Sequence, residues 1–209
     1  MIDVEKMCEI FMETNPNPKC ELNYINPYTF LVAIILSAQA TDKGVNKATP
    51  ALFEVASTPQ DMIDLGIENL KSYIKTIGLF NNKAKSIMAM SEDVIKRFNG
   101  ELPRRREDLE TLAGVGRKTA NVLLNDLYGD AVVAVDTHVL RLSKRLGLSN
   151  SDKPLQVEKD LLKVIPNEYH SKISHWLVLH GRYVCKAKKP ECENCPLQSI
   201  CPEFGLKLV

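Results

Sequence analysis

The sequence lacks three features that would place it in a specialised class. Its 209 residues carry a net charge of only +1, so any binding to nucleic acid must use positive charge gathered on one face. The longest apolar run, residues 30–36, is far too short to span a bilayer. The first residues mix acidic with apolar side chains and contain no cleavage site, which argues against a signal peptide. We therefore expect a cytoplasmic protein with no membrane partner.

The sequence also lacks a strand pattern. No segment alternates apolar and polar residues, there is no internal repeat or low-complexity tract, and the β-branched run at 132–135 is too short for a sheet. Apolar residues instead recur at helical spacing, and Asn26-Pro27, Thr58-Pro59 and Asp136 suit helix starts. The predicted class is all-α, with helices at 4–14, from 27, 42–55, from 59, 67–77, 81–98, 117–127, from 137, 154–164 and 168–184.

Cysteines are present but unevenly placed. Four of the six lie in one C-terminal segment, as Cys185-x6-Cys192-x2-Cys195-x5-Cys201. Clustering favours a metal site in a reducing compartment over disulfides. Four thiolates within such a segment can hold one tetrahedral zinc ion or a cuboidal iron–sulfur cluster. The spacing by itself does not choose between these two metals.

The segment 109–124, LETLAGVGRKTANVLL, predicts a helix, a tight turn and a second helix. Gly114 suits the left-handed conformation that closes a helix, and Gly116 lets the backbone approach another molecule closely. The first N–H groups of the second helix carry partial positive charge, which suits a phosphate. An ordinary helix corner is the alternative interpretation of this stretch taken alone.

LAGVGRKTA resembles the helix-hairpin-helix of base-excision repair glycosylases, and GVGRKTAN is similar to the endonuclease III family. INPYTFLVAIILSAQATDKGVN and IKTIGLFNNKAKSI resemble further blocks of that family, so nearly the whole chain is covered. The resemblance implies two helical lobes with the active site between them. It implies a helical barrel domain at 22–131, with the helix-hairpin-helix at about 106–128, and a discontinuous iron–sulfur domain formed by 1–21 and 132–209.

The same resemblance assigns the chemistry. Lys118 corresponds to the lysine that attacks the sugar C1′ of a damaged nucleotide, and a lysine at the positive end of a helix is otherwise unfavourably placed. Asp136, in the sequence VDTHV, corresponds to the active-site aspartate, although an aspartate there also suits a simple N-cap. The loop at 185–201 corresponds to a [4Fe-4S] loop, which makes its four cysteines the predicted cluster ligands.

DNA contacts are implied at further positions. Gln39, in SAQATD, corresponds to the residue that fills the hole left by an extruded base, and Leu79 corresponds to a leucine that wedges into the duplex. Buried or helix-end roles are the structural alternatives for both. The remaining expected contacts to the DNA backbone are Gly114, Val115, Gly116, Arg117, His138, Lys186 and Lys188.

The resemblance predicts a monomeric, nucleoid-associated DNA glycosylase with AP lyase activity, acting on double-stranded DNA that contains a damaged base or an abasic site. Adenine glycosylases of the superfamily use a Glu in the first long helix, where residues 33–36 here are apolar. Mismatch thymine glycosylases lack the hairpin lysine. A non-catalytic DNA-binding or redox-sensing module is the alternative from another class, but binding alone requires neither Lys118 nor Asp136.

Overall fold

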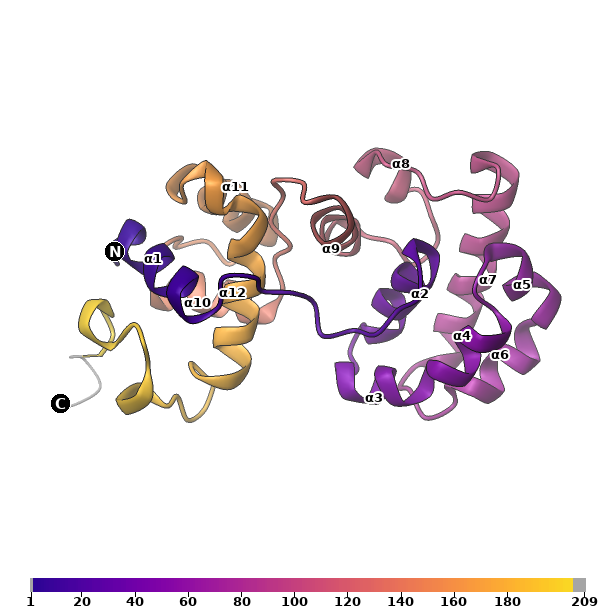
Figure 1. The fold of residues 1–209 in the computed structure, drawn as a ribbon, viewed down its shortest axis with the longest axis horizontal. Coiled ribbons are helices and arrows are strands. Elements are labelled where there is room, and N and C mark those ends of the chain that lie inside the picture. Colours follow the sequence, from indigo (N-terminus) through magenta and orange to yellow (C-terminus); the bar gives the residue numbers. More distant parts are fainter. Residues whose placement is uncertain (1, 205–209) are drawn as a thin grey trace. The chain divides into compact units, whose positions relative to one another are not determined.

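The computed structural model describes residues 2–204, and its regular elements in that range are all helices (Figure 1). The predicted all-α class is therefore confirmed. The chain forms two compact units. One comprises Glu21–Tyr128, and the other joins the residues up to Cys20 to those from Gly129 onward. Residues 1 and 205–209, which the predicted iron–sulfur domain includes, lie outside the described part.

The Glu21–Tyr128 unit contains α2 (Pro27–Ser37), α3 (Asp42–Ala48), α4 (Pro50–Val55), α5 (Pro59–Leu65), α6 (Ile67–Ile74), α7 (Phe80–Phe98), α8 (Arg106–Leu109) and α9 (Arg117–Tyr128). The other unit contains α1 (Val4–Thr14), α10 (Thr137–Arg145), α11 (Pro154–Val164), α12 (His170–Tyr183) and the short 3₁₀ turns η1 (Asn167–Tyr169), η2 (Cys192–Asn194) and η3 (Gln198–Ile200). No helix within residues 2–204 combines the length and apolarity needed to cross a bilayer.

Local capping explains where several helices begin. Asn26 Oδ1 accepts a hydrogen bond from the Thr29 N–H at 2.9 Å, while Thr29 Oγ1 accepts one from the Asn26 N–H at 2.9 Å. This reciprocal pair starts α2, and Thr58 and Asp61 form the corresponding pair that starts α5. Both predicted helix starts are confirmed.

Three predicted helices are wrong in extent. The segment 42–55 forms α3 and α4 rather than one helix, because Pro50 has no N–H to continue the hydrogen-bond ladder. The segment 67–77 is helical only as far as Ile74, where the Ile77 N–H bonds the Ile74 carbonyl at 2.9 Å and tightens the chain into a turn. The predicted helix at 168–184 also begins differently, since η1 precedes α12.

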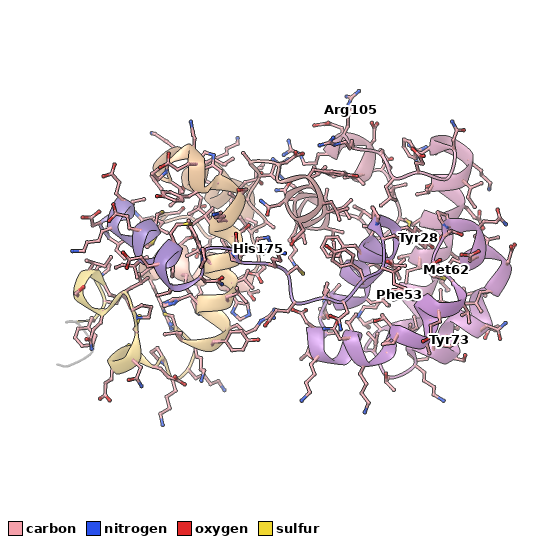
Figure 2. The ribbon with its side chains drawn as sticks, viewed as in Figure 1. Tyr28, Phe53, Met62, Tyr73, Arg105 and His175 are labelled. Atoms are coloured by element: carbon pink, nitrogen blue, oxygen red, sulfur yellow. The ribbon has the colours of Figure 1, made fainter. Side chains whose placement is uncertain are left out.

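The core of the Glu21–Tyr128 unit is built around α2, whose residues from Tyr28 to Leu36 are all buried. This helix packs against α7 and α9, and α7 also packs against α5 and α6 (Figure 1). Tyr28, Phe53 and Met62 bring side chains from three helices into this interior (Figure 2). An all-round apolar helix of this kind is stable only when neighbours cover every face, which the surrounding helices do.

The core of the other unit is built around Trp176 on α12, which is 2% exposed. Its ring stacks on Phe11 of α1 with centroids 5.6 Å apart, and its Nε1–H donates to the Asn15 carbonyl at 2.8 Å. These contacts hold the N-terminal helix against the C-terminal part of the chain. Asn15 and Trp176 are 161 positions apart in the sequence, and one hydrophobic core joins the two segments that contain them.

We predict that Gly114→Ala destabilises the protein more than Gly100→Ala does. Both glycines have positive φ, of +79° and +84°, so an alanine costs about 1–2 kcal/mol at either position. A Cβ at Gly114 would lie 2.9 Å from Ser86 Cβ, which adds about 1–3 kcal/mol, whereas a Cβ at Gly100 meets nothing within 4 Å. Urea unfolding of the two variants measures the difference, and equal losses would contradict the predicted clash.

Candidate functional site

The glycine hairpin between α8 and α9 is held against two other helices. Gly114 adopts φ +79°, and the space of its absent Cβ is bordered by Ser86 on α7 and Ile35 on α2. Val115 is only 6% exposed and donates its N–H to the Leu112 carbonyl at 3.1 Å. The predicted left-handed glycine is confirmed. The hairpin therefore presents an exposed backbone from a fixed position.

Helix α9 begins directly after this hairpin. Arg117 is its first residue, Lys118 is exposed in its first turn, and the first backbone bond runs from the Ala120 N–H to the Gly116 carbonyl at 3.0 Å. The N–H groups of the first turn of a helix have no carbonyl acceptor within the helix, so they can bind an anion. The Arg117 guanidinium lies 4.0 Å from the Glu110 carboxylate. An amine and a phosphate-binding helix end thus lie within one turn of each other.

Gln39 and Leu79 occupy two strained turns of the same unit. Both have positive φ, of 54° and 58°, and Asn99 is the other non-glycine residue with this conformation within residues 2–204. Gln39 is exposed after the end of α2, and the apolar Leu79 side chain is 57% exposed just before α7. Non-glycine residues held in this region cost free energy and concentrate at functional sites. The buried-leucine alternative is wrong for Leu79, whereas Gln39 lies at the end of α2, as its structural alternative has it.

Asp136 caps α10 in the other unit. Its Oδ1 accepts hydrogen bonds from the N–H groups of His138 at 2.8 Å and Val139 at 2.9 Å. The cap uses one carboxylate oxygen, so Oδ2 stays outside it. Buried apolar residues at 133–135 precede the aspartate and fix the start of the helix. The predicted capping role is confirmed, and it is compatible with a carboxylate that acts on a ligand.

The same helix holds the cysteine loop through two arginines that the sequence reasoning missed. Arg141 Nη2 donates to the carbonyls of Gly181 at 2.7 Å and Cys185 at 3.1 Å. Arg145 Nη1 donates to Cys185 Sγ at 3.4 Å and to the Lys186 carbonyl at 2.9 Å. The detectable signal was their four-residue spacing, which puts both on one face of the helix that Asp136 starts.

The approach of α10 to α12 depends on Gly181. A Cβ there would lie 3.0 Å from both Arg141 Nη2 and His138 Cβ. His138 Nδ1 also lies 3.3 Å from Arg141 Nη2, so this histidine packs against the arginine in a half-buried position. Burial, followed by repulsion from Arg145, lowers the pKa of Arg141. The histidine, the arginine and the glycine together fix how α10 lies on α12.

The predicted basic residues of the loop differ in their surroundings. Lys186 Nζ lies 2.5 Å from Glu191 Oε1, and this hydrogen bond together with the charge of Lys186 lowers the pKa of the Glu191 carboxyl. Lys188 and Lys189 are exposed. The positive charge that this loop offers to an anion is therefore carried more by the two later lysines than by Lys186.

The four C-terminal cysteines line one partly open pocket. The short turns η2 and η3 lie between successive cysteines of the last three, and all four cysteines border the same space. No three His, Cys, Asp or Glu side chains in the described part of the chain converge closely enough to hold a single ion. Four thiols around one pocket are the donor set that an iron–sulfur cluster requires.

The thiols of this pocket must lose their protons before they can bind a metal. Burial is the main cause that raises the pKa of the Cys195 thiol to about 11, so metal binding must displace its proton. Cys195 Sγ lies 3.6 Å from His180 Nε2, and burial lowers the pKa of that imidazole to about 4. A neutral histidine and the Arg145 guanidinium beside Cys185 thus surround the thiols with hydrogen-bonding partners.

The predicted site residues are divided between the two units. Gln39, Leu79, residues 114–117 and Lys118 belong to the Glu21–Tyr128 unit. The other unit carries Asp136, His138, Lys186, Lys188 and the four C-terminal cysteines. Each group is ordered within its own unit by the contacts described above.

Comparisons with known proteins agree with this arrangement. The family model of the HhH-GPD superfamily base excision DNA repair proteins matches residues 32–167. The model of the iron-sulfur binding domain of endonuclease III matches residues 185–201. These are the segments that carry the hairpin, Asp136 and the cysteine pocket. The predicted [4Fe-4S] cofactor is confirmed.

Individual relatives cover nearly the whole chain. Endonuclease III of Haemophilus influenzae is 56% identical over 189 residues, which is 90% of each chain, and that of Escherichia coli is 50% identical over the same shares. The structure is similar to a trapped endonuclease III–DNA covalent intermediate, with a TM-score of 0.91, 43% identity and complete coverage of both chains. A non-covalent endonuclease III–DNA complex gives a TM-score of 0.92 at 43% identity, covering 100% of this chain and 99% of the other. The chain therefore belongs to the endonuclease III family, within the HhH-GPD superfamily of base excision DNA repair proteins.

Proposed function

We propose that the protein removes damaged, mainly oxidised, pyrimidines from double-stranded DNA and cuts the strand 3′ to the resulting abasic site. The observation that carries this proposal is the exposed Lys118 amine in the first turn of α9, next to the backbone of the glycine hairpin. An amine beside a phosphate-binding helix end can reach the sugar attached to that phosphate. The protein acts as a monomer on DNA in the nucleoid.

The proposed binding to DNA does not require recognition of the bases. The hairpin glycines and the first N–H groups of α9 bind phosphates of the damaged strand, and Lys188 and Lys189 add salt-dependent contacts from the loop. Such contacts position the duplex without reading its sequence. A repair enzyme requires this, because damage occurs in any sequence context.

Extrusion of the damaged nucleotide follows from the two strained turns. Leu79 offers an exposed apolar wedge for the base stack, and Gln39 offers an amide that can hydrogen-bond within the vacated space. Extrusion costs least where damage has weakened stacking or pairing, which contributes to selectivity. The nucleotide is then presented to Lys118.

The chemistry begins when Lys118 Nζ bonds to C1′ as the bond between C1′ and the base breaks, so that the base leaves with the electron pair. Ring opening gives a protonated imine between Lys118 and the sugar, which acidifies the C2′ proton. Loss of that proton expels the 3′ phosphate, and the strand is cut by β-elimination. Water then hydrolyses the imine and restores the amine.

Asp136 supplies the negative charge for these steps. Its cap bonds hold the carboxylate in one orientation, with Oδ2 outside the cap. In this position it stabilises positive charge on the sugar or receives the proton that Lys118 loses. Lys118 and Asp136 are thus the two residues of the proposed chemistry, one as nucleophile and one as negative charge.

Cys185, Cys192, Cys195 and Cys201 are the proposed ligands of the cluster. When bound, the cluster cross-links the four thiolates and fixes the fold of the loop. Arg145 and Arg141 transmit this order to α10, because they bond the loop and lie on the helix that Asp136 caps. The cysteines and the two arginines therefore orient α10 and its Asp136. They take no part in electron transfer, because no redox change occurs in the reaction.

The structure agrees with this function better than with adenine removal. The helix α2 carries only buried apolar side chains at 33–36, where adenine glycosylases of the superfamily place a Glu. A carboxylate that acts on an adenine has no counterpart in that stretch. The hairpin lysine instead supports bond formation to the sugar.

Lys118→Gln tests the nucleophile. An amide cannot form an imine, so we expect strand cutting to be abolished while binding to abasic duplex DNA stays close to that of the unaltered protein. Borohydride should trap the unaltered protein covalently on abasic DNA and should not trap the variant. Lys96→Gln, an exposed change near the end of α7, is the matched control and should trap normally. Cutting by Lys118→Gln would refute the assignment.

Asp136→Asn separates the carboxylate charge from the cap. Asparagine caps helices about as well as aspartate, so the free energy of unfolding should change by less than about 1 kcal/mol. The single-turnover rate of cutting should fall by about a hundredfold or more, because the negative charge is lost. Asp3→Asn, which alters the N-cap of α1, should leave the rate unchanged. An unaltered rate in Asp136→Asn would exclude the electrostatic role.

Cys192→Ser tests the ligand set. The purified protein should be yellow-brown and absorb near ~400 nm, as iron–sulfur proteins do. The variant should lose this absorbance and part of its iron, whereas Cys20→Ser, which changes a cysteine outside the loop, should retain both. Iron analysis and absorbance spectra provide the measurement. Full iron content in Cys192→Ser would remove that residue from the ligands.

A further inference from the structure

Lys83 is a buried lysine that the proposed chemistry does not use. It lies near the start of α7 and is only 5% exposed. Its Nζ donates a hydrogen bond to the Leu36 carbonyl at 2.9 Å, and burial lowers its pKa. Removing an ammonium group from water is costly, so a methionine would fill this volume at lower cost. The property that a methionine lacks is the bond to Leu36.

The Leu36 carbonyl lies in the last turn of α2, where helix carbonyls lack intrahelical partners and carry partial negative charge. A buried cation donor at this end fixes the point at which the helix stops. The chain then runs through Ala38 to Gln39, three residues beyond Leu36, where φ becomes positive. One end of the Lys83 side chain is therefore bonded to the base of the Gln39 turn.

The backbone of Lys83 is bonded to the second turn. Its N–H donates to the Leu79 carbonyl at 3.1 Å, and the Asn82 N–H donates to the same oxygen at 3.1 Å. These are the first backbone bonds of α7, so Leu79, with its positive φ and exposed apolar side chain, lies one turn before Lys83 at the start of the same helix. The Lys83 side chain thus ties the start of α7, where Leu79 lies, to the end of α2, although 47 positions separate Lys83 from Leu36.

We propose that Lys83 is a positioning residue that fixes the separation of the Gln39 and Leu79 turns, so that both side chains enter a DNA duplex together. This inference rests on the proposed function, in which these two side chains open the base stack. Both turns belong to one unit, and α2 packs directly on α7 within it. Strained backbone of this kind persists only where its surroundings hold it, and the Lys83 side chain bonds the end of α2 from the first turn of α7, directly after Leu79.

The proposal distinguishes two substrates. Opening a duplex requires both turns at the correct spacing, because the stacked and paired bases must be displaced. An abasic site in a single strand has no paired stack to open, so cutting there requires only the nucleophile and the carboxylate. Loss of the Lys83 bond should therefore impair cutting of the duplex selectively.

The test is the single-turnover rate of cutting at an abasic site, measured on a duplex and on the same strand alone. In Lys83→Met we expect the duplex rate to fall by about tenfold or more, because misplacement of inserting groups is costly, while the single-strand rate is unchanged. Lys83→Arg keeps a cationic donor and should restore most of the duplex rate. Lys96→Met removes an exposed positive charge from the same helix and should change neither rate.

Every other outcome counts against the proposal. Equal losses on both substrates would indicate a merely structural lysine, and an unchanged duplex rate would exclude any positioning role. If Lys83→Met does not fold, Lys83→Gln, which retains a shorter donor, is measured in its place with the same expected selectivity. Unaltered protein that cuts neither substrate would overturn the proposed function and this inference with it. If the unaltered protein cuts both substrates and the ratio of its duplex rate to its single-strand rate is the same in the variant, this inference alone is overturned.

Discussion

The docking of the glycine hairpin onto α2 and α7 is the contact on which the Glu21–Tyr128 unit depends for its chemistry. Gly114 fits there because it has no Cβ to strike Ser86, and Val115 is buried beside it. This contact fixes where α9 begins and therefore where the Lys118 amine is held. The start of α9 and the Lys118 amine, which the proposed function assigns to phosphate binding and to attack on the sugar, are positioned by one steric constraint.

In the other unit, hydrogen bonds hold the helix that begins at Asp136. Asp136 starts α10, and two arginines farther along the same helix bond the backbone and one thiol of the cysteine loop. The helix is thus held at its start by the cap and along its length by the loop. An iron–sulfur cluster bound by the loop would therefore be connected, through these arginines, to the helix that Asp136 starts. In the proposed function, this connection gives the cofactor a structural effect on the position of the carboxylate.

Local chemistry made much of the fold predictable. Helix starts at Asn26, Thr58 and Asp136 followed from side chains that bond backbone groups three residues away or less, and such bonds need no distant partner. Helix extent was less predictable. The break at Pro50 follows from the missing N–H of proline, whereas the early end of α6 at Ile74 depends on how the following turn packs, which a run of apolar residues does not reveal.

The sequence by itself determined the all-helical class, the hairpin with its left-handed Gly114, the cap at Asp136 and the cysteine spacing, because each depends on residues close together in the chain. Only the tertiary structure decided that Lys83 joins the Gln39 and Leu79 turns and that Arg141 and Arg145 bond the cysteine loop. The side chains of these three residues bond atoms about forty or more positions away, outside their own helices. The existence of these bonds depends on which helix faces pack together, and packing is a property of the whole core.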